Sequence, residues 1–336
     1  MVALKPDADQ IRDVLKNLAS QDWVKRTERR WWPAFVFHYT DIMNAVGILR
    51  DGYVYSRKYL EDNARLVVSS GSPSVLAGTN IAIKDCVRLY FVPKTPTQYW
   101  AEGIYSQATL SKSKYPEAHC PVPVFFLFHS AKILARGDCR FSDGNLASGK
   151  AQTLSTAGEL EQLPWNKVYH TGRIDYSRAE NSDIVFRRCA EVIVPRKLDL
   201  GALRYIYCRS EAERESLLYL LPPHLRKQYR GRVISSTRSD LFCRRQTFIE
   251  TVSLSSEAAS FHFSPDTASP GPFHLRIDLT VGSTGYRRDA EDFKLEKPYV
   301  LVIPLPLVVA PAYTIRLSLD GHLAYANTYK EIEIPF

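Results

Sequence analysis

Two side chains able to bind a ligand, His38 and Thr40, stand two positions apart where an apolar run ends, in the segment WPAFVFHYTDIMNAVGILRDG. On an extended chain, residues two apart face the same way. An imidazole and a hydroxyl would therefore point at one place. The residues that follow predict a helix, because apolar side chains recur at helical spacing and a glycine ends the run: Ile42, Val46, Leu49 and Gly52. Thr40 or Asp41 would cap this helix.

A lone carboxylate, Glu191, stands in the apolar segment CAEVIV. If this segment is a strand, Glu191 shares a face with Cys189 and Ile193. A carboxylate on so apolar a face must be paired or used in chemistry. Two plainer alternatives stay open. Glu191 could lie on the exposed face of an edge strand, and His38 could be a core histidine bonded to the backbone.

Basic residues alternate with tryptophans in the segment WVKRTERRWW, residues 23–32. Cations that hold phosphates, beside rings that stack on bases, are typical of single-strand recognition. The same pattern fits a helix whose tryptophans pack on the core while its charges face water. The sequence leaves both interpretations open.

The positive charge is concentrated in the N-terminal part of the chain. The 336 residues include 44 Lys or Arg and 36 Asp or Glu, which gives a formal charge of +8. Residues 244–336 hold 9 basic and 11 acidic residues, which leaves 35 and 25 for residues 1–243. Such a surplus suits an anionic partner such as nucleic acid, although it also fits a basic surface that only faces water.

The sequence lacks the patterns of a membrane-spanning helix, a signal peptide and a cysteine-based metal site. No apolar run approaches the ~20 residues of a membrane-spanning helix, and the N-terminus is charged where a signal peptide would be apolar. We therefore expect a cytoplasmic protein with no membrane partner. The cysteines are scattered singly, which predicts reduced, mostly buried thiols and no metal site: Cys86, Cys120, Cys139, Cys189, Cys208 and Cys243.

The patterns of hydrophobicity divide the chain in two. Residues 5–32 predict a helical arm, residues 57–84 a long polar loop of functional character, and Ser210 the cap of a later helix. From about Thr247, short alternating segments separated by Gly, Pro and Ser predict an all-β module. Strands in the first part are expected at three apolar segments: 87–92, 122–128 and 184–195.

Several segments, in order, resemble the DarT family of NAD-dependent DNA ADP-ribosyltransferase toxins. FHYTDIMNAVGILRDG resembles the opening motif of that family, and DCVRLYFVPKTPTQYW resembles its strand ending in Y-F-x-P-R-S-P. ELEQLPW and RRCAEVIVP resemble its acidic helix and the strand with its catalytic glutamate. The resemblance covers about residues 34–242. Arg88 replaces a usual Pro, and Lys94 and Thr95 replace the usual Arg-Ser.

The resemblance implies a mono-ADP-ribosyltransferase fold, which is α+β with a split central β-sheet, for residues 1–243. Residues 244–336 would form the C-terminal, sandwich-like all-β module, which the shortest family members lack. The donor would be NAD, without a metal. The family also uses an arginine in its NAD site, between the opening helix and the Y-F-x-P strand. Arg57 and Arg65 both fit this position, and Arg65, the better placed, is the candidate for catalysis together with Glu191. The residues implied for NAD binding and catalysis are His38, Thr40, Asn44, Tyr90 and Glu191.

Cleavage of the nicotinamide–ribose bond leaves an oxocarbenium-like centre, as in glycoside hydrolysis. Glu191 would stabilise this charge and draw a proton from the attacking base. The acceptor would lie against basic and aromatic residues near Glu191, which can stack on a base and hold its phosphates: Tyr169, His170, Arg173, Arg178, Arg187 and Arg188.

We therefore predict an enzyme that transfers ADP-ribose from NAD to a base in single-stranded DNA, as the toxin of a bacterial toxin–antitoxin or anti-phage system. A macrodomain-type antitoxin is implied by the resemblance alone. An RNA acceptor stays open, because nothing in the sequence reports on a 2′-hydroxyl. A non-catalytic, single-strand-binding protein on a transferase fold stays open as well. Because the basic surplus precedes residue 244, we expect nucleic-acid binding to survive removal of residues 247–336.

Overall fold

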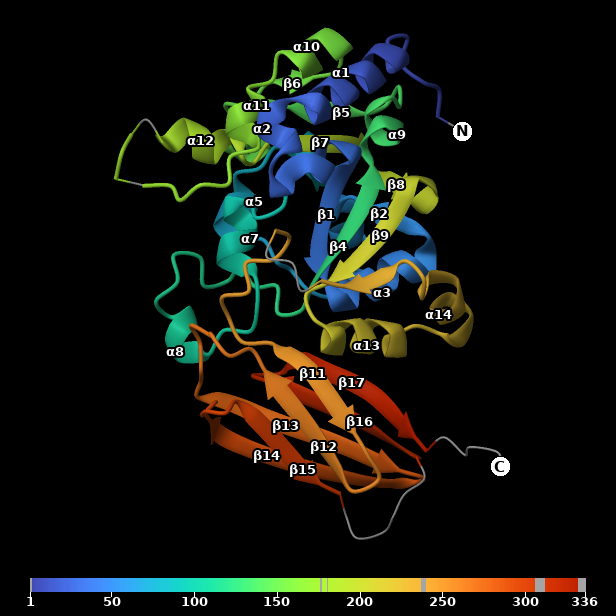
Figure 1. Cartoon of the computed structure of the whole chain (residues 1–336), viewed down its shortest axis with the longest axis vertical. Helices are drawn as coiled ribbons and strands as arrows, with labels where there is room; N and C mark the ends of the chain where they lie inside the picture. Colours follow the sequence, from blue (N-terminus) through green and yellow to red (C-terminus); the bar gives the residue numbers. More distant parts are fainter. Residues whose placement is uncertain (1, 176, 180, 237–239, 306–311, 332–336) are drawn as a thin grey trace.

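The computed structural model describes residues 2–175, 177–179, 181–236, 240–305 and 312–331. Helices and strands alternate in the N-terminal part, up to Ser235, which is the upper part of Figure 1. The described residues between 249 and 330 contain strands as their only regular elements, and these form the lower part of the figure. Each part has its own hydrophobic core. The mixed helix and sheet content of the N-terminal part agrees with the predicted class.

An eight-stranded sheet forms the centre of the N-terminal part, in the order β10-β9-β4-β1-β3-β7-β5-β6. Strand β3 lies between β1 and β7 and is antiparallel to both. A separate pair joins β2 (Tyr53–Tyr55) to β8 (Lys197–Asp199). The strands of the large sheet are β1 (Phe35–Asp41), β3 (Cys86–Tyr90), β4 (Pro123–His129), β5 (Arg140–Ser142), β6 (Thr153–Leu154), β7 (Glu191–Pro195), β9 (Leu203–Cys208) and β10 (Val233–Ser235).

Short helices surround this sheet, and among the described residues none is long and apolar enough to cross a membrane. The predicted helical arm is present as α1, α2 and η1. The helices are α1 (Ala8–Ser20), α2 (Asp22–Lys25), η1 (Glu28–Ala34), α3 (Ile42–Asp51), α4 (Arg57–Asp62), α5 (Pro73–Ala77), α6 (Ile81–Lys84), α7 (Pro96–Ala101), α8 (Gln107–Leu110), α9 (Ser130–Leu134), η2 (Leu146–Ser148), α10 (Ala157–Glu161), α11 (Trp165–Val168), α12 (Asn181–Arg187), η3 (Leu200–Ala202), α13 (Glu211–Leu220) and α14 (Pro223–Tyr229).

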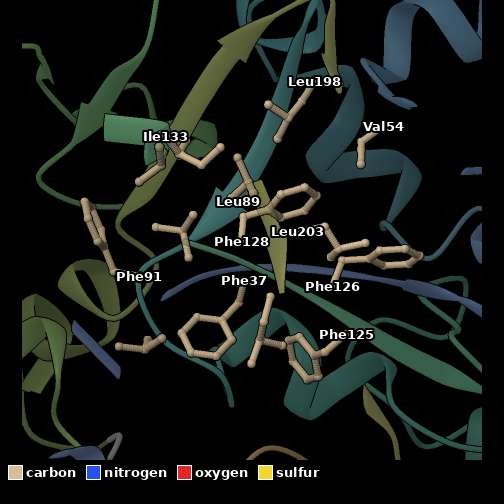
Figure 2. Close-up of a cluster of buried hydrophobic side chains, with 14 of the residues drawn as sticks. Phe37, Val54, Leu89, Phe91, Phe125, Phe126, Phe128, Ile133, Leu198 and Leu203 are labelled. Atoms are coloured by element: carbon tan, nitrogen blue, oxygen red, sulfur yellow. The ribbon is translucent and has the colours of Figure 1, made fainter. Parts of the chain in front are cut away.

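Aromatic rings fill the core of the sheet (Figure 2). Strand β4 is buried along almost its whole length, because its apolar run PVFFLF has side chains on both faces of a covered sheet. The rings of Phe37 on β1 and Phe125 on β4 meet edge to face, with centroids 6.1 Å apart. Such pairs are stabilising beyond the area they bury. The core therefore fixes β1 against β4 and, with it, the end of β1 that carries His38 and Thr40.

The corner between β1 and α3 forms as the sequence predicts. Asp41, not Thr40, is the cap: its Oδ1 accepts the amide of Met43 at 2.9 Å, and its Oδ2 accepts the amide of Val122 at 3.2 Å. Gly52 ends the helix with φ of 75°, a left-handed conformation that glycine adopts without strain. Both ends of α3 are therefore fixed by local chemistry.

Two of the expected elements are different in the structure. Residues 57–84 are not one long loop, because α4, α5 and α6 lie within them. The strand expected at 184–195 begins only at Glu191, and residues up to Arg187 form α12 instead. A short apolar run such as Ile184 to Phe186 fits a strand or a helix equally well, so periodicity alone could not decide.

The described residues of the C-terminal part form two sheets around one hydrophobic cluster. In β13, buried and half-buried side chains alternate, as the sequence pattern predicts. One sheet has the order β11-β12-β15 and the other the order β14-β13-β16-β17. Their strands are β11 (Ile249–Leu254), β12 (Ala258–Phe263), β13 (Phe273–Val281), β14 (Thr284–Phe293), β15 (Val300–Pro304), β16 (Ala312–Leu319) and β17 (His322–Lys330).

Helix α13 connects the two parts. It begins at the predicted cap Ser210, whose hydroxyl accepts the amide of Glu213 at 3.2 Å and donates to the carbonyl of Ile249 on β11 at 2.6 Å. On its other turns, Glu215 accepts the hydroxyl of Tyr325 at 2.6 Å, and Ser216 accepts the amide of Ala326 at 3.0 Å. These bonds attach β11 and β17 to a helix of the N-terminal part.

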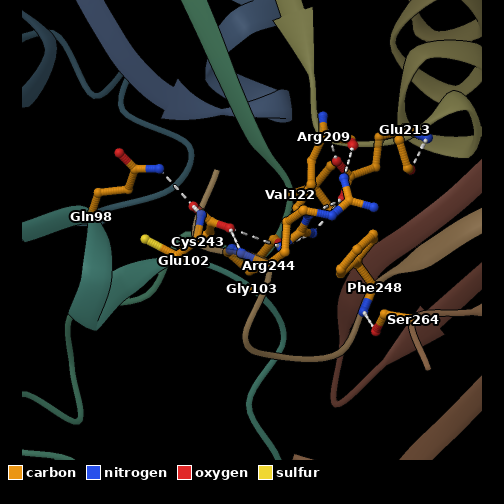
Figure 3. A network of polar contacts seen from close by, with 12 residues as sticks. Gln98, Glu102, Gly103, Val122, Arg209, Glu213, Cys243, Arg244, Phe248 and Ser264 are labelled. Atoms are coloured by element: carbon orange, nitrogen blue, oxygen red, sulfur yellow. Dashed lines mark hydrogen bonds and ion pairs between the residues drawn. The ribbon is translucent and has the colours of Figure 1, made fainter. Parts of the chain in front are cut away.

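A network of buried charges lies at the same boundary (Figure 3). Arg209 is fully buried, forms an ion pair with Glu213 and lies 3.9 Å from the carboxylate of Glu102. Its guanidinium also stacks on the ring of Phe248, 4.2 Å from the ring centroid. The carboxylate of Glu102 accepts the backbone amide of Arg244 at 2.8 Å. A truncation at residue 247 would therefore remove a contact of this network, so that deletion alone cannot locate nucleic-acid binding.

We expect replacement of Arg209 by Met to lower the free energy of unfolding by about 3–5 kcal/mol, because it leaves two buried carboxylates without their cation. Replacement of Arg12, whose ion pair with Asp9 is exposed, is the matched control and should cost less than about 1 kcal/mol. Denaturant unfolding of both variants and the wild type would measure this. Equal stability of the two variants would contradict a structural role for Arg209.

Candidate active site

A pocket of about 240 Å³ opens where β1, α3 and β3 meet, beside the short helix α4. The pocket is lined by all the residues predicted to bind NAD, which are His38, Thr40, Asn44 and Tyr90. Both candidate arginines, Arg57 and Arg65, line it as well. The fold therefore brings together side chains that are far apart in the sequence.

His38 is held by the backbone of the neighbouring strand. Its Nδ1 lies 3.1 Å from the carbonyl oxygen of Arg88, and a carbonyl can only accept, so Nδ1 carries the proton. Burial lowers the pKa of His38, with the hydrogen bond to Arg88 opposing, so the ring is neutral near pH 7. Its Nε2 is then an acceptor, suited to a hydroxyl group of a ligand. The plain alternative, a histidine bonded to the backbone, and the ligand-binding one are both compatible with this arrangement.

Asn44 holds the chain that borders the pocket. Its Oδ1 accepts the amides of Val67 and Val68, both at 3.1 Å, and its Nδ2 donates to the carbonyl of Val68 at 2.8 Å. Direct contact of Asn44 with the ligand stays a prediction. Its amide also fixes the segment between α4 and α5, and in this way Asn44 shapes the pocket.

The two candidate arginines differ in how they are held. Arg65 forms an ion pair with Asp51 at the end of α3 and lies over the ring of Tyr55, 5.2 Å from the centroid. Arg57 donates to Glu61 at 2.6 Å and to the hydroxyl of Ser69 at 2.7 Å. Both face the pocket from α4 or just beyond it, so the placement does not separate them.

Glu191 is completely buried at the start of β7, an interior strand, which rules out the exposed edge-strand alternative. Its Oε1 accepts Nε of Arg88 at 2.7 Å and Nη2 of Arg88 at 2.6 Å. Its Oε2 accepts the amide of Leu146 at 3.3 Å. Burial raises the pKa of Glu191, and the charge of Arg88 opposes this. The carboxylate is therefore more basic than an ordinary one while it stays paired.

Tyr90 and Arg88 connect this carboxylate to the pocket. Tyr90 is directly opposite Glu191 in the register of β3 and β7, and Arg88 is two residues along the same strand face. Both line the pocket. Burial, followed by the charge of Glu191, raises the pKa of Tyr90, so its phenol stays a proton-bearing donor. Sequence reasoning noted Arg88 only as a departure from a motif, although the alternation of strand residues could have placed it beside Glu191.

The residues expected to bind the acceptor do not form one surface. Tyr169 is buried, and its ring packs against Trp165 and Trp32 at centroid distances of 5.2 Å and 5.5 Å. The prediction that it stacks on a nucleobase is therefore not supported by its placement. Arg173 and Arg178 are exposed, and Arg178 pairs with Asp175 at 3.4 Å.

Arg187 and Arg188 also differ from each other. Arg187 ends α12 and is held by two carboxylates, Asp143 at 2.6 Å and Asp183 at 3.1 Å. Arg188 follows the helix, and its Nη2 donates to the carbonyl of Lys94 at 2.6 Å. Arg188 therefore lies next to the segment that follows β3, whereas Arg187 serves to hold α12.

The tryptophans of the arm pack rather than face solvent. Trp32 is buried, and Nε1 of Trp31 donates to Asp240 at 3.0 Å. Arg29, from the same arm, donates to the carbonyl of Tyr169 at 3.1 Å. Burial lowers the pKa of the half-buried His170, and the charges of Arg188 and Arg29 lower it further, so these three lie close together. This cluster combines a residue of the arm with two that were expected to bind the acceptor.

All six cysteines are free, and four of them are buried, as the sequence predicts. Among the described residues, no group of three His, Cys, Asp or Glu side chains could hold a metal ion. The polar side chains that line the pocket also include Asp51, Lys84 and Gln98.

A family model described as "ssDNA thymidine ADP-ribosyltransferase, DarT" matches residues 37–234. A search of curated proteins gave no match. The chain is similar to a solved structure of Thermus sp. 2.9 DarT in complex with ADP-ribosylated ssDNA, with 22% identity and a TM-score of 0.49 over 62% of this chain and 96% of that one. For Thermus sp. 2.9 DarT in complex with NAD⁺ the values are 21%, 0.46, 62% and 98%. For Thermosipho africanus DarTG in complex with ADP-ribose they are 19%, 0.43, 60% and 49%.

We expect replacement of Asn44 by Ala to weaken binding of NAD by roughly 10-fold, because the segment it holds loses three hydrogen bonds, each worth about 0.5–1.5 kcal/mol. Replacement of Asn63 by Ala is the control, since that exposed amide donates only to the carbonyl of Tyr59, at 2.8 Å. Calorimetric titration of NAD into each variant would measure the effect. Unchanged affinity in the Asn44 variant would show that the segment does not shape the NAD site.

Proposed function

Because this chain belongs to the DarT family of ssDNA thymidine ADP-ribosyltransferases, we propose that it transfers ADP-ribose from NAD⁺ to a thymidine base of single-stranded DNA. The observation that carries this proposal is the buried carboxylate of Glu191, paired with Arg88 at the wall of a pocket that collects His38, Thr40 and Tyr90. The family membership bears on the two alternatives that the sequence leaves open, a non-catalytic binding protein and an RNA acceptor. The chain is an NAD-dependent enzyme rather than a binding module, and DNA rather than RNA is the family's acceptor.

The donor set of the pocket fits NAD⁺. NAD⁺ supplies the ADP-ribosyl group, and positive charge develops on its ribose as nicotinamide leaves. The neutral His38 offers Nε2 as an acceptor for a ribose hydroxyl, and the hydroxyl of Thr40 is on the same strand face. Arg57 and Arg65 line the same pocket, and guanidinium groups bind phosphates bidentately. We assign the diphosphate to these arginines, and we prefer Arg65 because the resemblance to the family, not its place in the pocket, favours it.

Glu191 has two tasks in this proposal. As a carboxylate it stabilises the positive charge that develops on the ribose, and a preorganised charge in a water-poor site acts more strongly than in water. Because burial raises its pKa, Glu191 is also a better base than an exposed glutamate, so it can take the proton of the attacking nucleobase. The phenol of Tyr90 stays protonated beside it and acts as a hydrogen-bond donor.

The acceptor strand is assigned to the basic cluster of Arg29, His170 and Arg188, and Arg173 is exposed nearby in sequence. Arginines hold phosphates, and an imidazole can stack on a base. Tyr169 and Arg187 are left out, because the first is buried and the second is held by two aspartates.

We assign the eight-stranded sheet to the split central sheet of the ADP-ribosyltransferase fold, with residues 1–243 as the transferase domain. Residues 244–336 are an accessory, sandwich-like β domain. The separate cores of the two parts support this division, as does the end of the family match at residue 234. The buried network around Arg209 means that the accessory domain also stabilises the transferase domain.

We assign a biological role as the toxin of a toxin–antitoxin or anti-phage system that acts in the cytoplasm. An ADP-ribosylated base on a single strand obstructs pairing, so a cell that makes the enzyme needs a partner that removes the mark. A macrodomain-type antitoxin has that activity. Expression in a host without such a partner should stop growth, while the inactive Glu191 variant should be tolerated.

We expect replacement of Glu191 by Gln to lower the transfer rate by at least ~100-fold, the usual effect of removing a charge-stabilising group, while NAD binding persists. The assay would use labelled NAD⁺ with thymidine-containing oligonucleotides of DNA and of RNA. Replacement of the exposed Glu257 by Gln is the control. A fully active Glu191 variant would remove this residue from the mechanism, and label on RNA alone would overturn the acceptor assignment.

We expect replacement of Arg173 by Ala to weaken binding of a single-stranded oligonucleotide and to reduce the slope of log affinity against log salt by about 0.7, the value for one phosphate contact on a single strand. Replacement of Lys330 by Ala, an exposed cation on β17, should leave both unchanged. Titrations at three salt concentrations would measure this. An effect from Lys330 instead would move the DNA contact to the accessory domain.

A further inference from the structure

Arg88 makes the closest polar contacts that the structure gives to Glu191. Two of its nitrogens, Nε and Nη2, donate to the same oxygen, Oε1, at 2.7 Å and 2.6 Å. The carboxylate side chain is fully buried, while the side chain of Arg88 is 25% exposed. The cation therefore lies between the carboxylate and the pocket that it lines.

The backbone of residue 88 has a second contact in the site. Its carbonyl accepts Nδ1–H of His38, so it sets the ring orientation and leaves Nε2 to the pocket. The side chain of Arg88 thus contacts the carboxylate of Glu191, and its carbonyl contacts the ring of His38. The register of β3 against β7, with Arg88 opposite Ile193 and Tyr90 opposite Glu191, keeps this relation fixed.

We propose that Arg88 is a positioning residue of the transferase site, which holds Oε1 of Glu191 in place and keeps the carboxylate ionised behind the wall of the pocket. This inference rests on the proposed function, because it assigns the task of Glu191 to a carboxylate. The carboxylate of Glu191 also has a hydrogen bond with the side chain of Tyr90, and its Oε2 accepts the amide of Leu146 at 3.3 Å.

The groups around Glu191 define its electrostatic setting. Tyr90 and Arg88 face it from β3, the thiol of Cys189 from the residues before β7, and the amide of Leu146 from η2. Burial raises the pKa of Cys189 to about 12, so this thiol is neutral. Arg88 is therefore the cation that opposes the desolvation of Glu191. Without it, burial alone would push the carboxylate toward its protonated, uncharged form.

Removal of Arg88 should therefore change the pH dependence of kcat. In wild type the group that must be ionised, Glu191, loses its proton at a pH lowered by Arg88. In the Arg88→Met variant the pKa of Glu191 should rise by roughly 1–3 units, the usual effect of one nearby opposite charge. The acidic limb of the kcat profile should move to higher pH by the same amount. At pH 7 kcat should therefore fall, and it should recover in part at alkaline pH.

The test uses the full-length protein as wild type, Arg88→Met and Arg88→Lys. Arg140→Met is the matched control, because Arg140 is paired with the same residue, Ile193, from the opposite side of β7, and is exposed. Lysine keeps a cation and should give a smaller shift than methionine. The first readout is the kcat profile between pH 5 and pH 9 with a thymidine oligonucleotide. The second is the titration of Glu191 itself, by NMR of protein labelled with ¹³C-glutamate and assigned with Glu191→Gln.

The two readouts separate the inference from the function on which it rests. If wild type transfers nothing, the proposed function fails, and the NMR titration still reports whether Arg88 sets the pKa of Glu191. An equal loss of kcat at every pH, with an unmoved titration of Glu191, would make Arg88 merely structural and overturn the inference. A rise of kcat in Arg88→Met would overturn it too, because the ion pair would then be inhibitory. If the methionine variant does not fold, the lysine variant decides by the same criteria.

Discussion

The buried guanidinium of Arg209 is the interaction on which the arrangement of this chain depends. A charge with no exposure costs several kcal/mol unless it is paired, so the carboxylates of Glu102 and Glu213 have to stay beside it. Glu102 in turn accepts Nε2 of Gln98 at 2.7 Å, and Gln98 lines the pocket. One network therefore fixes the C-terminal strands, helix α13 and a wall of the candidate active site relative to one another.

The ion pair of Glu191 and Arg88 is subject to the same cost of burying charge, but it is arranged differently. Glu191 is as buried as Arg209, but its partner Arg88 is partly exposed and lines the pocket. In the Arg209 network every charge is enclosed, so the groups serve stability. In the pair of Glu191 and Arg88 only the carboxylate is enclosed, so a molecule in the pocket would meet the guanidinium of Arg88 and not the carboxylate behind it.

The sequence predicts the local features of the site and misses the long-range ones. The cap at Asp41 and the glycine at Gly52 depend on residues a few positions apart, so their types and spacing are sufficient. The ion pair between Arg88 and Glu191 joins residues on different strands, and only the register of β3 with β7 shows it. Tyr169 was assigned to the acceptor because aromatic rings stack on bases, yet a ring in a core packed with tryptophans has the same sequence signature.

Asn44 shows that a residue of a motif can have a structural task that the motif does not reveal. A side-chain amide has two donors and two acceptor positions, and here the backbone of Val67 and Val68 occupies three of them. The spacing from His38 to Asn44 then joins the end of β1 to the turn of α3 that holds the backbone of Val67 and Val68. A residue that orders the rim keeps the pocket open before any ligand arrives, which lowers the entropy cost of binding. The motif therefore supplies both side chains that line the pocket and a side chain that orders the backbone beside it.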